Sequence, residues 1–487
     1  MPPRNLADFV KAYDVRGLVP EQLDVDVAWA LGAAFAEVVI LREGRGAGPS
    51  GCVIGHDMRA TSPELSRAFG AGVTSRGVDV THIGLASTDG LYFASGHLGL
   101  AGAMFTASHN PAAYNGIKLC RPGARPVGQD SGLTDVRDLA QELLDGTVEQ
   151  RDARVGSTGE RDVLADYAGF LRGLVDLSAI RPLRVVVDAG NGMGGYTVPA
   201  VLETAAGLPP LPLEVVPLYF ELDGTFPNHE ANPLEPKNLL DLQAAVLTHA
   251  ADLGLAFDGD ADRCFVVDER GEAVSPSAIT ALIATREVAR EVAAGTPVDE
   301  VSIVHNVITS AQVPEIIAEL GARAVRTRVG HSFIKDEMAR ADAVFGGEHS
   351  AHYYFRDFWF ADTGMLAAMH VLAALGEQSG SLSDLMGDYT AYAASGEINS
   401  TVEDQAARTA EVRHWAAGRG VEVDELDGLT LTHAGDGADD PMWWLNLRAS
   451  NTEPLLRLNV EAADADTMAA IRDDVLSLVR GTARGVS

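Results

Sequence analysis

The sequence predicts an α/β protein with three related α/β domains, whose sheets are mixed but mainly parallel, and a smaller C-terminal α+β domain. Two patterns predict this fold. A strand–helix–strand unit occurs three times, and the C-terminal segment contains short strands followed by an amphipathic helix. The length of 487 residues allows three to four domains, because a domain averages about 150 residues.

Each strand–helix–strand unit starts with a short apolar strand, a polar turn and a helix start. The first strands begin at Gly51, Arg184 and Val301, and the second strands are predicted at 78–83, 213–220 and 324–329. A strand that returns through a helix to a second strand normally lies parallel to it. Each unit therefore predicts parallel strands with helices on the faces of their sheet.

The C-terminal segment has a different pattern. A helix is predicted at 406–418, strands at 428–433, 443–448 and 456–460, and a closing amphipathic helix at 465–480. Changes of pattern near 160, 272 and 390 place the domain boundaries. The predicted domains are 1–160, 161–272, 273–390 and 391–487.

The composition excludes several classes of function. With 37 basic and 69 acidic residues the formal net charge is −32, which argues against binding to nucleic acid or to an anionic membrane. A local basic pocket for a phosphorylated substrate remains possible. Cys52, Cys120 and Cys264 lack metal-ligand spacing, and no apolar run reaches the roughly 18 residues that a membrane helix needs. We therefore expect a soluble, cytoplasmic protein without a signal peptide.

The first segment with chemical potential is Thr-Ala-Ser-His-Asn-Pro at 106–111, after an apolar strand at 102–105. Asn110 precedes a proline, so the chain cannot continue as a helix, and Ser108 is expected on a sharp turn at a strand end. With His109 beside it and Lys118 further on, Ser108 is a candidate nucleophile or phosphoryl carrier. By itself the segment is more typical of an ordinary serine turn.

The second segment is Phe-Asp-Gly-Asp-Ala-Asp-Arg at 257–263. Asp258, Asp260 and Asp262 alternate, so they project to one side of an extended chain. Carboxylates this close repel one another unless a cation lies between them, and oxygen ligands favour Mg²⁺. An EF-hand calcium loop is disfavoured, because Arg263 stands where that loop requires glycine. A nucleotide-sugar transferase with an Asp-x-Asp motif remains an alternative on this segment alone.

Two further turns carry polar groups. Glu348 and Ser350, after an apolar strand at 343–345, could hydrogen-bond to sugar hydroxyls, although a plain turn accounts for them better. The other turn offers a guanidinium fork, hydroxyls, an amide and backbone N–H groups, which suit a phosphate. It comprises Arg448, Ser450, Asn451, Thr452 and Arg457. A solvated turn with a surface arginine is the competing interpretation.

These four segments occur one per predicted domain, in the order found in the alpha-D-phosphohexomutase superfamily. The chain most closely resembles the phosphomannomutase/phosphoglucomutase branch of that superfamily. The likeness extends from the segment 11–17 to Arg457, nearly the whole chain. It also includes Tyr13, Arg16, the Ser-Pro-Glu segment at 62–64, the Gly330-His331 turn and Lys335.

The resemblance implies four domains around a central cleft: a phosphoserine-loop domain, a metal-binding domain, a sugar-recognition domain and a phosphate-binding domain. Ser108 would carry a phosphoryl group and share one Mg²⁺ with the three aspartates. Transfer of that group to a hexose phosphate would give a hexose 1,6-bisphosphate, which also serves as activator. The intermediate would turn over and return its other phosphate to the serine.

The resemblance also implies roles for the remaining residues. Glu348 and Ser350 would read the sugar hydroxyls at C3 and C4, and His109 would orient the serine loop. Proton handling and positive charge would come from Lys118, His331, Arg263 and Arg16. Substrate contacts would come from Tyr13, Gly330, His331 and the five residues of the phosphate turn.

Three positions depart from the pattern of the branch. Ala261 stands where relatives often have glycine, and we expect this change to be harmless. His349 stands where close relatives often have methionine. Ile308 stands where a basic residue is common, which puts one contact with sugar or phosphate in doubt.

The implied reaction interconverts mannose 6-phosphate and mannose 1-phosphate, with glucose phosphates as possible substrates. The alternatives within the family are a phosphoglucomutase and a mutase for phosphorylated amino sugars. Outside it they are a Mg²⁺-dependent phosphatase, a glycosyltransferase and a non-catalytic sensor of sugar phosphates. The expected partners are hexose phosphates only, with no nucleic acid or membrane, and the chain would be a monomer or homodimer.

Overall fold

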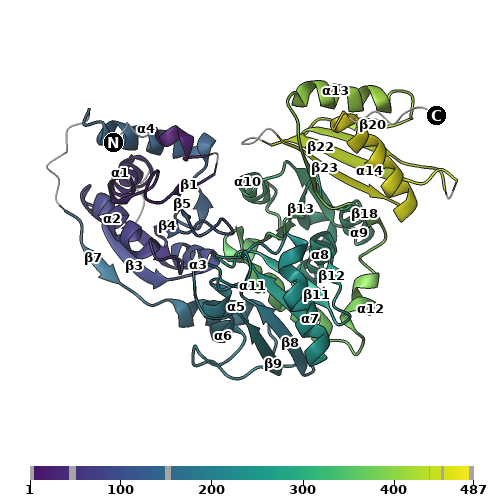
Figure 1. The fold of residues 1–487 in the computed structure, drawn as a ribbon. Coiled ribbons are helices and arrows are strands. Elements are labelled where there is room, and N and C mark those ends of the chain that lie inside the picture. The colour runs from purple at the N-terminus through teal and green to yellow at the C-terminus, as the bar shows by residue number, and fades with distance from the viewer. Residues whose placement is uncertain are drawn as a thin grey trace. The chain divides into compact units, whose positions relative to one another are not determined.

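A computed structural model describes residues 5–11, 13–42, 51–147, 155–437, 439–450 and 455–481. The chain divides into two compact units. One comprises Met1–Pro276 with Ser350–Leu385, and the other comprises Ser277–His349 with Met386–Ser487. Figure 1 shows the elements along the chain. None of the helices in these described ranges is long and apolar enough to cross a membrane.

The first sheet lies in the first unit and has the strand order β1-β5-β4-β2-β3-β7, with β6 paired to β5. Strands β4, β2, β3 and β7 are parallel, whereas β1, β5 and β6 join antiparallel, so the sheet is mixed as predicted. The strands are β1 (Val15–Leu18), β2 (Gly51–His56), β3 (Asp79–Leu85), β4 (Ala101–Phe105), β5 (Tyr114–Arg121), β6 (Arg125–Pro126) and β7 (Thr158–Glu160).

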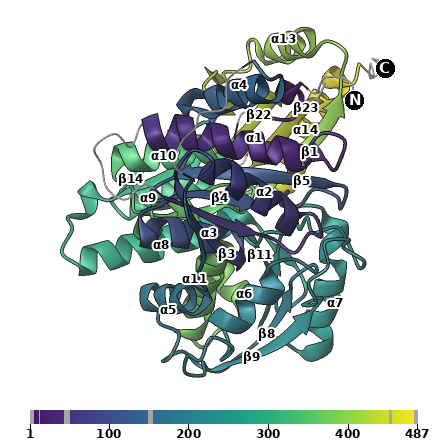
Figure 2. The ribbon, with the colours of Figure 1, turned by 90° about the vertical axis from the view of Figure 1, so that its left-hand side faces the viewer.

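Helices and aromatic side chains cover this sheet. The helices are α1 (Val25–Phe35), continued by a π-helix (Ala36–Arg42), α2 (Ser62–Thr74), α3 (Thr88–Leu98) and α4 (Leu133–Leu144). Helices α1 and α2 lie side by side (Figure 2). They approach closely because Gly32 and Gly72 have no side chain: a Cβ on either would lie 2.1 or 2.0 Å from a carbonyl oxygen of the other helix. Phe35, Phe69 and Phe105 pack together in the core between sheet and helices, with the ring of Phe69 edge-to-face with that of Phe105.

The second sheet, also in the first unit, has the order β12-β11-β10-β8-β9. Strands β8, β9 and β10 are parallel, and β10, β11 and β12 form an antiparallel meander. The strands are β8 (Leu183–Asp188), β9 (Leu213–Leu218), β10 (Leu253–Phe257), β11 (Cys264–Asp268) and β12 (Ala273–Val274). All residues of β10 and β11 are buried. Both ends of the turn between them are therefore held by packed, paired strands.

Four helices and a short hairpin complete the first unit. The helices are α5 (Leu164–Leu174), α6 (Gly194–Val201), α7 (Leu240–His249) and α11 (Gly364–Gly376). The hairpin pairs β16 (Tyr353–Phe355) with β17 (Ala361–Asp362). Helix α11 is buried along its whole length, which fits a sequence that is apolar except for His370.

The second unit contains the third strand–helix–strand repeat. Strands β14, β13 and β15 are parallel in that order. They are β13 (Ser302–Asn306), β14 (Arg323–Thr327) and β15 (Phe345–Gly347), with helices α8 (Pro276–Ala293), α9 (Gln312–Glu319) and α10 (His331–Ala341). All three repeats predicted from the sequence are therefore confirmed as parallel strand pairs.

The C-terminal sheet is antiparallel throughout, with the order β18-β23-β22-β21-β20 and β19 paired to β23. Its strands are β18 (Ala393–Ala394), β19 (Ile398–Thr401), β20 (Glu422–Asp424), β21 (Leu429–His433), β22 (Trp443–Ala449) and β23 (Leu455–Ala462). Helices α13 (Gln405–Ala416) and α14 (Ala465–Val479) pack against it and against each other. The predicted C-terminal α+β domain is confirmed, and a short helix, α12 (Leu382–Gly387), precedes it.

Candidate functional site

Ser108 lies on a sharp turn directly after strand β4, as its sequence context predicts. Its φ is +50°, in the left-handed region that non-glycine residues rarely adopt. Its backbone N–H donates to Thr106 Oγ1 at 2.9 Å. A non-glycine residue in this conformation costs roughly 1–2 kcal/mol, so the surrounding contacts must hold the turn in place.

Arg59, which the sequence analysis did not select, holds this turn. Its buried guanidinium donates to the carbonyl oxygens of Ser108 at 2.9 Å and Asn110 at 2.7 Å. It also donates to the carbonyls of Pro111 and Tyr114 at 3.0 and 3.1 Å. The buried carboxylate of Asp57 pairs with it at 3.2 Å. The sequence signal was available, because Asp57 and Arg59 immediately follow strand β2.

Strand register brings two predicted cations to the same side of the sheet. Strand β5 places Lys118 opposite Met104 of β4, near the end that leads to Ser108. Strand β1 pairs Arg16 with Gly116, and Arg16 donates to Asn110 Oδ1 at 2.6 Å. Tyr13, just before β1, is half-buried.

The three aspartates form the turn between β10 and β11, where Phe257 pairs with Cys264. We call the segment Asp258–Arg263 the aspartate hairpin. Ser108 Oγ donates to Asp258 Oδ2 at 2.8 Å, so residues 150 positions apart meet here. Gly259 permits the approach, because a Cβ there would lie 2.4 Å from the Ser108 carbonyl oxygen.

The aspartate hairpin fits a divalent cation. One oxygen from each of Asp258, Asp260 and Asp262 lies within 4.8 Å of the others, and all three residues are buried. In the described structure, Oδ1 of Asp260 and Oδ1 of Asp262 are buried and have no hydrogen-bond partner. Leaving such oxygens unpaired is costly, and a metal that prefers oxygen ligands would satisfy them.

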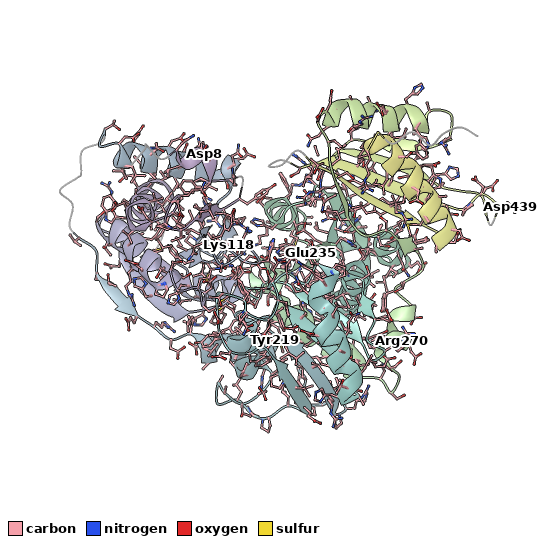
Figure 3. The ribbon with its side chains drawn as sticks, viewed as in Figure 1. Asp8, Lys118, Tyr219, Glu235, Arg270 and Asp439 are labelled. Carbon is pink, nitrogen blue, oxygen red and sulfur yellow. The ribbon has the colours of Figure 1, made fainter. Side chains whose placement is uncertain are left out.

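Lys118, labelled in Figure 3, neutralises part of this charge. Its ammonium lies 2.7 Å from Asp260 Oδ2 and 2.6 Å from Asp262 Oδ2. Burial alone would lower the pKa of Lys118, but the two carboxylates outweigh burial and raise it well above its ordinary value. Lys118 is therefore a cation in this structure.

The carboxylates of Asp258 and Asp262 have pKa values shifted in opposite directions. Burial, with the charges of Asp262 and Asp260, raises the pKa of Asp258 to about 7, although Arg263 opposes this. Burial also acts to raise the pKa of Asp262, but Lys118 and His352 hold it well below its ordinary value.

Arg263 and His109 complete the surroundings of the serine. Arg263 donates to Asp258 Oδ2 at 2.9 Å and to His109 Nδ1 at 2.6 Å. Burial, together with Arg263 and Arg16, holds the pKa of His109 well below its ordinary value. Its Nδ1 also lies 3.1 Å from Ser108 Oγ. The structure thus brings together Ser108, His109, Lys118, Arg16, Arg263 and the three aspartates within one unit.

Two residues near the cluster were missed by the sequence analysis. His352 Nε2 lies 3.5 Å from Asp262 Oδ1 and 3.8 Å from Asp362 Oδ2, and these three residues form a second acidic and imidazole group. His352 precedes the hairpin β16–β17 and Asp362 ends it. Ser350, a predicted sugar contact, lies 3.2 Å from His352 Nδ1 through its Oγ. His352 lies only four residues beyond the predicted Glu348, and this closeness in the sequence could have identified it as a candidate site residue.

The structure corrects one expectation. Ala261 was expected to be a harmless replacement for glycine, but its φ is +60°. A Cβ in this left-handed region costs roughly 1–2 kcal/mol. Alanine at this position is therefore strained.

In the second unit, Glu348 is buried and accepts two hydrogen bonds through Oε1. The donors are the side-chain amide of Asn306 at 3.0 Å and the backbone N–H of Gly330 at 3.2 Å. Gly330 has φ +135° and precedes helix α10, whose first residue is His331. The structure thus joins the Glu348 turn to the Gly330-His331 turn. Lys335 is buried in α10.

The two remaining departures from the family pattern, Ile308 and His349, lie in this unit, where Ile308 is buried and His349 is partly exposed. His349 Nδ1 lies 3.2 Å from Ser277 Oγ, and burial lowers its pKa. Ile308 is buried and its backbone N–H donates to Asn306 Oδ1 at 3.1 Å.

The predicted phosphate turn joins β22 and β23, in which Arg448 and Arg457 are directly paired. Both guanidinium groups contact Glu397, at 3.4 and 3.3 Å, which offsets the repulsion between them. The Ser450 backbone N–H donates to the Leu455 carbonyl at 2.9 Å. The predicted Asn451 and Thr452 lie outside the described residues.

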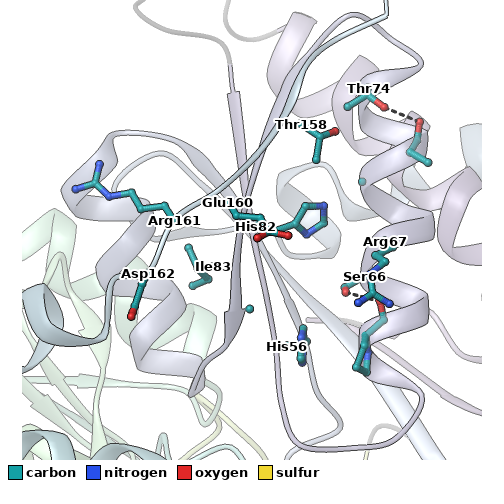
Figure 4. A pocket seen from close by; sticks show the side chains of 14 residues that line it. His56, Ser66, Arg67, Thr74, His82, Ile83, Thr158, Glu160, Arg161 and Asp162 are labelled. Carbon is teal, nitrogen blue, oxygen red and sulfur yellow. Dashed lines mark hydrogen bonds between the residues drawn. The ribbon is translucent and has the colours of Figure 1, made fainter. Parts of the chain in front are cut away.

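A cavity of about 650 Å³ lies elsewhere in the first unit, between α2, β3 and the segment around β7 (Figure 4). His56, Arg67, His82 and Glu160 are among the residues that line it. None of the predicted catalytic, metal-binding or substrate-binding residues lines this cavity. The cavity is therefore separate from the cluster around Ser108.

Comparison with known proteins gives a consistent result along the whole chain. Residues 8–142, 165–271 and 275–392 match phosphoglucomutase/phosphomannomutase alpha/beta/alpha domains I, II and III, and residues 397–478 match the C-terminal domain of the same family. A phosphomannomutase of Salmonella montevideo is 39% identical over 478 residues, 98% of this chain and 99% of that protein.

Two further relatives extend this comparison. A protein of Xanthomonas campestris pv. campestris named "Phosphohexose mutases" is 40% identical over 475 residues, 97% of this chain and 99% of its own length. The crystal structure of a phosphoglucomutase/phosphomannomutase family protein from Burkholderia thailandensis has a TM-score of 0.82 and 30% identity. The match covers 99% of this chain and 98% of that one.

Proposed function

The chain belongs to the phosphoglucomutase/phosphomannomutase family, and we propose that it interconverts mannose 6-phosphate and mannose 1-phosphate. It is an enzyme of the mutase type. Mannose phosphates are favoured as substrates because full-length relatives at 37–39% identity carry the name phosphomannomutase. The relatives named phosphohexose mutases favour a second possibility, that glucose phosphates are also accepted.

We further propose that Ser108 is the phosphoryl carrier. The observation that carries this proposal is the contact between Ser108 Oγ and Asp258 Oδ2 at 2.8 Å, beside the buried Asp260 Oδ1, which has no hydrogen-bond partner. In the first half-reaction the phosphoryl group leaves Ser108 Oγ and joins the free hydroxyl of the sugar phosphate, and the proton of that hydroxyl ends on Ser108 Oγ. The product is a hexose 1,6-bisphosphate. After this intermediate turns over, its other phosphoryl group returns to Ser108 and the second sugar phosphate is released.

The residues of the first unit have separate tasks in this proposal. Asp258, Asp260 and Asp262 would hold one Mg²⁺, which offsets negative charge on a transferring phosphoryl group. Lys118 adds fixed positive charge beside them, since its pKa keeps it protonated. His109 would orient the serine loop, because its Nδ1 accepts a hydrogen bond from Arg263 and is thereby fixed in position.

The second unit would recognise the substrate. Arg448 and Arg457, with Ser450, Asn451 and Thr452, would bind the phosphate that is not being transferred. Glu348, Gly330 and His331 would contact the sugar, as would Ser350 and Tyr13 of the first unit. Reading only the C3 and C4 hydroxyls lets the sugar bind in both orientations, which the two half-reactions require.

A coupled assay with Mg²⁺ and a trace of hexose 1,6-bisphosphate as activator tests the substrate. A kcat/KM at least tenfold higher for mannose 1-phosphate than for glucose 1-phosphate, about 1.4 kcal/mol, would establish the mannose preference. Equal values would establish dual specificity. No turnover with either substrate would exclude both and leave amino-sugar phosphates or a non-catalytic binding role.

The phosphoryl carrier is tested separately with Ser108→Ala. This change removes one hydroxyl from a turn and no part of a core, so we expect an unchanged melting temperature and complete loss of turnover. Mass spectrometry of the wild-type protein after incubation with hexose 1,6-bisphosphate should place a phosphate on the peptide that contains Ser108. Wild-type turnover by Ser108→Ala would refute the mechanism.

A further inference from the structure

A buried carboxylate, Asp89, joins three separate segments of the first unit. Its Oδ2 accepts hydrogen bonds from Tyr167 Oη and Thr363 Oγ1, both at 2.7 Å, and its Oδ1 accepts one from Ser87 Oγ. All four residues are at most 1% exposed. Burial raises the pKa of Asp89 to about 6, and the three hydroxyl donors limit this rise. The carboxylate thus accepts three hydroxyl hydrogen bonds, which favour its charged form.

Two of these donors are N-cap residues of helices. Ser87 caps α3 and accepts a hydrogen bond from the N–H of Gly90 at 3.1 Å. Thr363 caps α11 and accepts one from the N–H of Leu366 at 3.1 Å. Each hydroxyl thus accepts from its helix and donates to Asp89, which fixes its orientation. The carboxylate consequently ties the starts of two helices to each other and, through Tyr167, to α5.

The N-termini of α3 and α11 both contact the aspartate hairpin. Thr88, between Ser87 and Asp89, donates from Oγ1 to Asp260 Oδ2 at 2.5 Å and from its N–H to the Asp260 carbonyl at 3.0 Å. Gly364, the first residue of α11, lies so close that a Cβ on it would be 2.6 Å from the carbonyl carbon of Arg263. The start of α3 therefore contacts the Asp260 side chain of the hairpin, and the start of α11 contacts its backbone at Arg263.

We propose that Thr88 is a positioning residue for Asp260 and that Asp89 holds Thr88 in place. Thr88 and Lys118 both contact Oδ2 of Asp260, so the rotation of this carboxylate is fixed and Oδ1 is the oxygen left without a partner. The inference rests on the proposed function, in which Asp260 holds a divalent cation. Groups that orient a metal-binding carboxylate change metal affinity by 10–100-fold when they are removed.

Metal binding to the metal-free full-length protein tests the proposal. Mn²⁺, whose free form is counted by electron paramagnetic resonance, would be titrated into the wild type and into Thr88→Val, which removes the hydroxyl and keeps the shape. We expect the dissociation constant to rise at least tenfold in Thr88→Val. Thr88→Ser, which restores the hydroxyl, should stay within twofold of the wild type. The matched control is Thr74→Val, which changes a buried threonine of α2 whose Oγ1 donates to the Ala71 carbonyl of its own helix at 3.1 Å.

Kinetics and a second variant separate positioning from mere folding. At saturating Mg²⁺ the kcat of Thr88→Val should recover to within a few-fold of the wild type, with an unchanged KM for the sugar phosphate. Asp89→Asn places an amide N–H₂ group where hydroxyls now donate to a carboxylate, so some of these hydrogen bonds are lost. This variant keeps Thr88 itself, and we expect it to weaken Mn²⁺ binding at least threefold.

Three results overturn the proposal in different ways. Wild-type Mn²⁺ affinity in folded Thr88→Val would refute the role of Thr88. Wild-type affinity in folded Asp89→Asn would refute the role of Asp89. A wild-type protein that binds no Mn²⁺ or Mg²⁺ would instead refute the metal site of the proposed function, and this inference with it.

Discussion

Replacing Arg59 by lysine tests whether its guanidinium holds the turn of Ser108. The Arg59 guanidinium makes five hydrogen bonds, four to carbonyls of the turn and of the segment that follows it and one to Asp57. A lysine ammonium has three donors, so at least two partners are lost. Hydrogen bonds to charged groups contribute about 1.5–3 kcal/mol each. Because water can replace part of this at the exposed Pro111, we expect the turn to lose about 3 kcal/mol of local stability.

Hydrogen exchange measures this local loss directly. In Arg59→Lys, amides within 106–114 should exchange about 100-fold faster than in the wild type, since each 1.4 kcal/mol is a factor of ten. Arg67→Lys is the matched control, because Arg67 lies on the neighbouring helix α2 and is exposed. Exchange of 106–114 within threefold of the wild type in Arg59→Lys would refute the reasoning that this guanidinium maintains the turn.

Two further predictions concern stability. Ala261→Gly should raise the free energy of unfolding by about 0.5–1 kcal/mol, because relief of the left-handed strain exceeds the added entropy of the unfolded chain; a lower melting temperature would contradict this. Burial lowers the pKa of His305 to about 4. Between pH 6.5 and 4 the imidazole therefore binds a proton in the unfolded chain but not in the folded one. The free energy of unfolding is unaffected by His305 above pH 6.5 and decreases by as much as about 3 kcal/mol as pH falls toward 4. His305→Asn should therefore flatten the dependence of melting temperature on pH between 6.5 and 4, and an unchanged slope would contradict it.

The sequence predicted those parts of the fold that depend on short stretches of chain. The strands β2, β8 and β13 are almost wholly buried and have apolar centres, and each leads into a helix, so local pattern alone identified the three repeats. The aspartate hairpin was equally visible, because its three carboxylates lie within five residues. Ser108 was found because the proline after Asn110 enforces a turn at a strand end.

Contacts between distant segments could not be predicted in the same way. Thr88 and Asp260 are 172 residues apart, and Thr88 is an unremarkable helix start until the fold places it against the hairpin. Arg59 reaches the Ser108 carbonyl across 49 residues. The strain at Ala261 also escaped notice, because a residue's φ depends on the turn that its neighbours impose.

The charge balance of the cluster explains why the chain can bury three aspartates before any metal arrives. Lys118 pairs with Asp260 and Asp262, and Arg263 pairs with Asp258, so one negative charge remains uncompensated among these residues. The raised pKa of Asp258, about 7, lets this carboxyl take up a proton when no metal is present, and His352 lies 3.5 Å from Asp262 Oδ1. With Mg²⁺ bound, the same groups carry one positive charge and attract a phosphoryl group. The placement of Lys118 and Arg263 thus serves folding in the metal-free state and, under the proposed function, phosphoryl transfer in the metal-bound state.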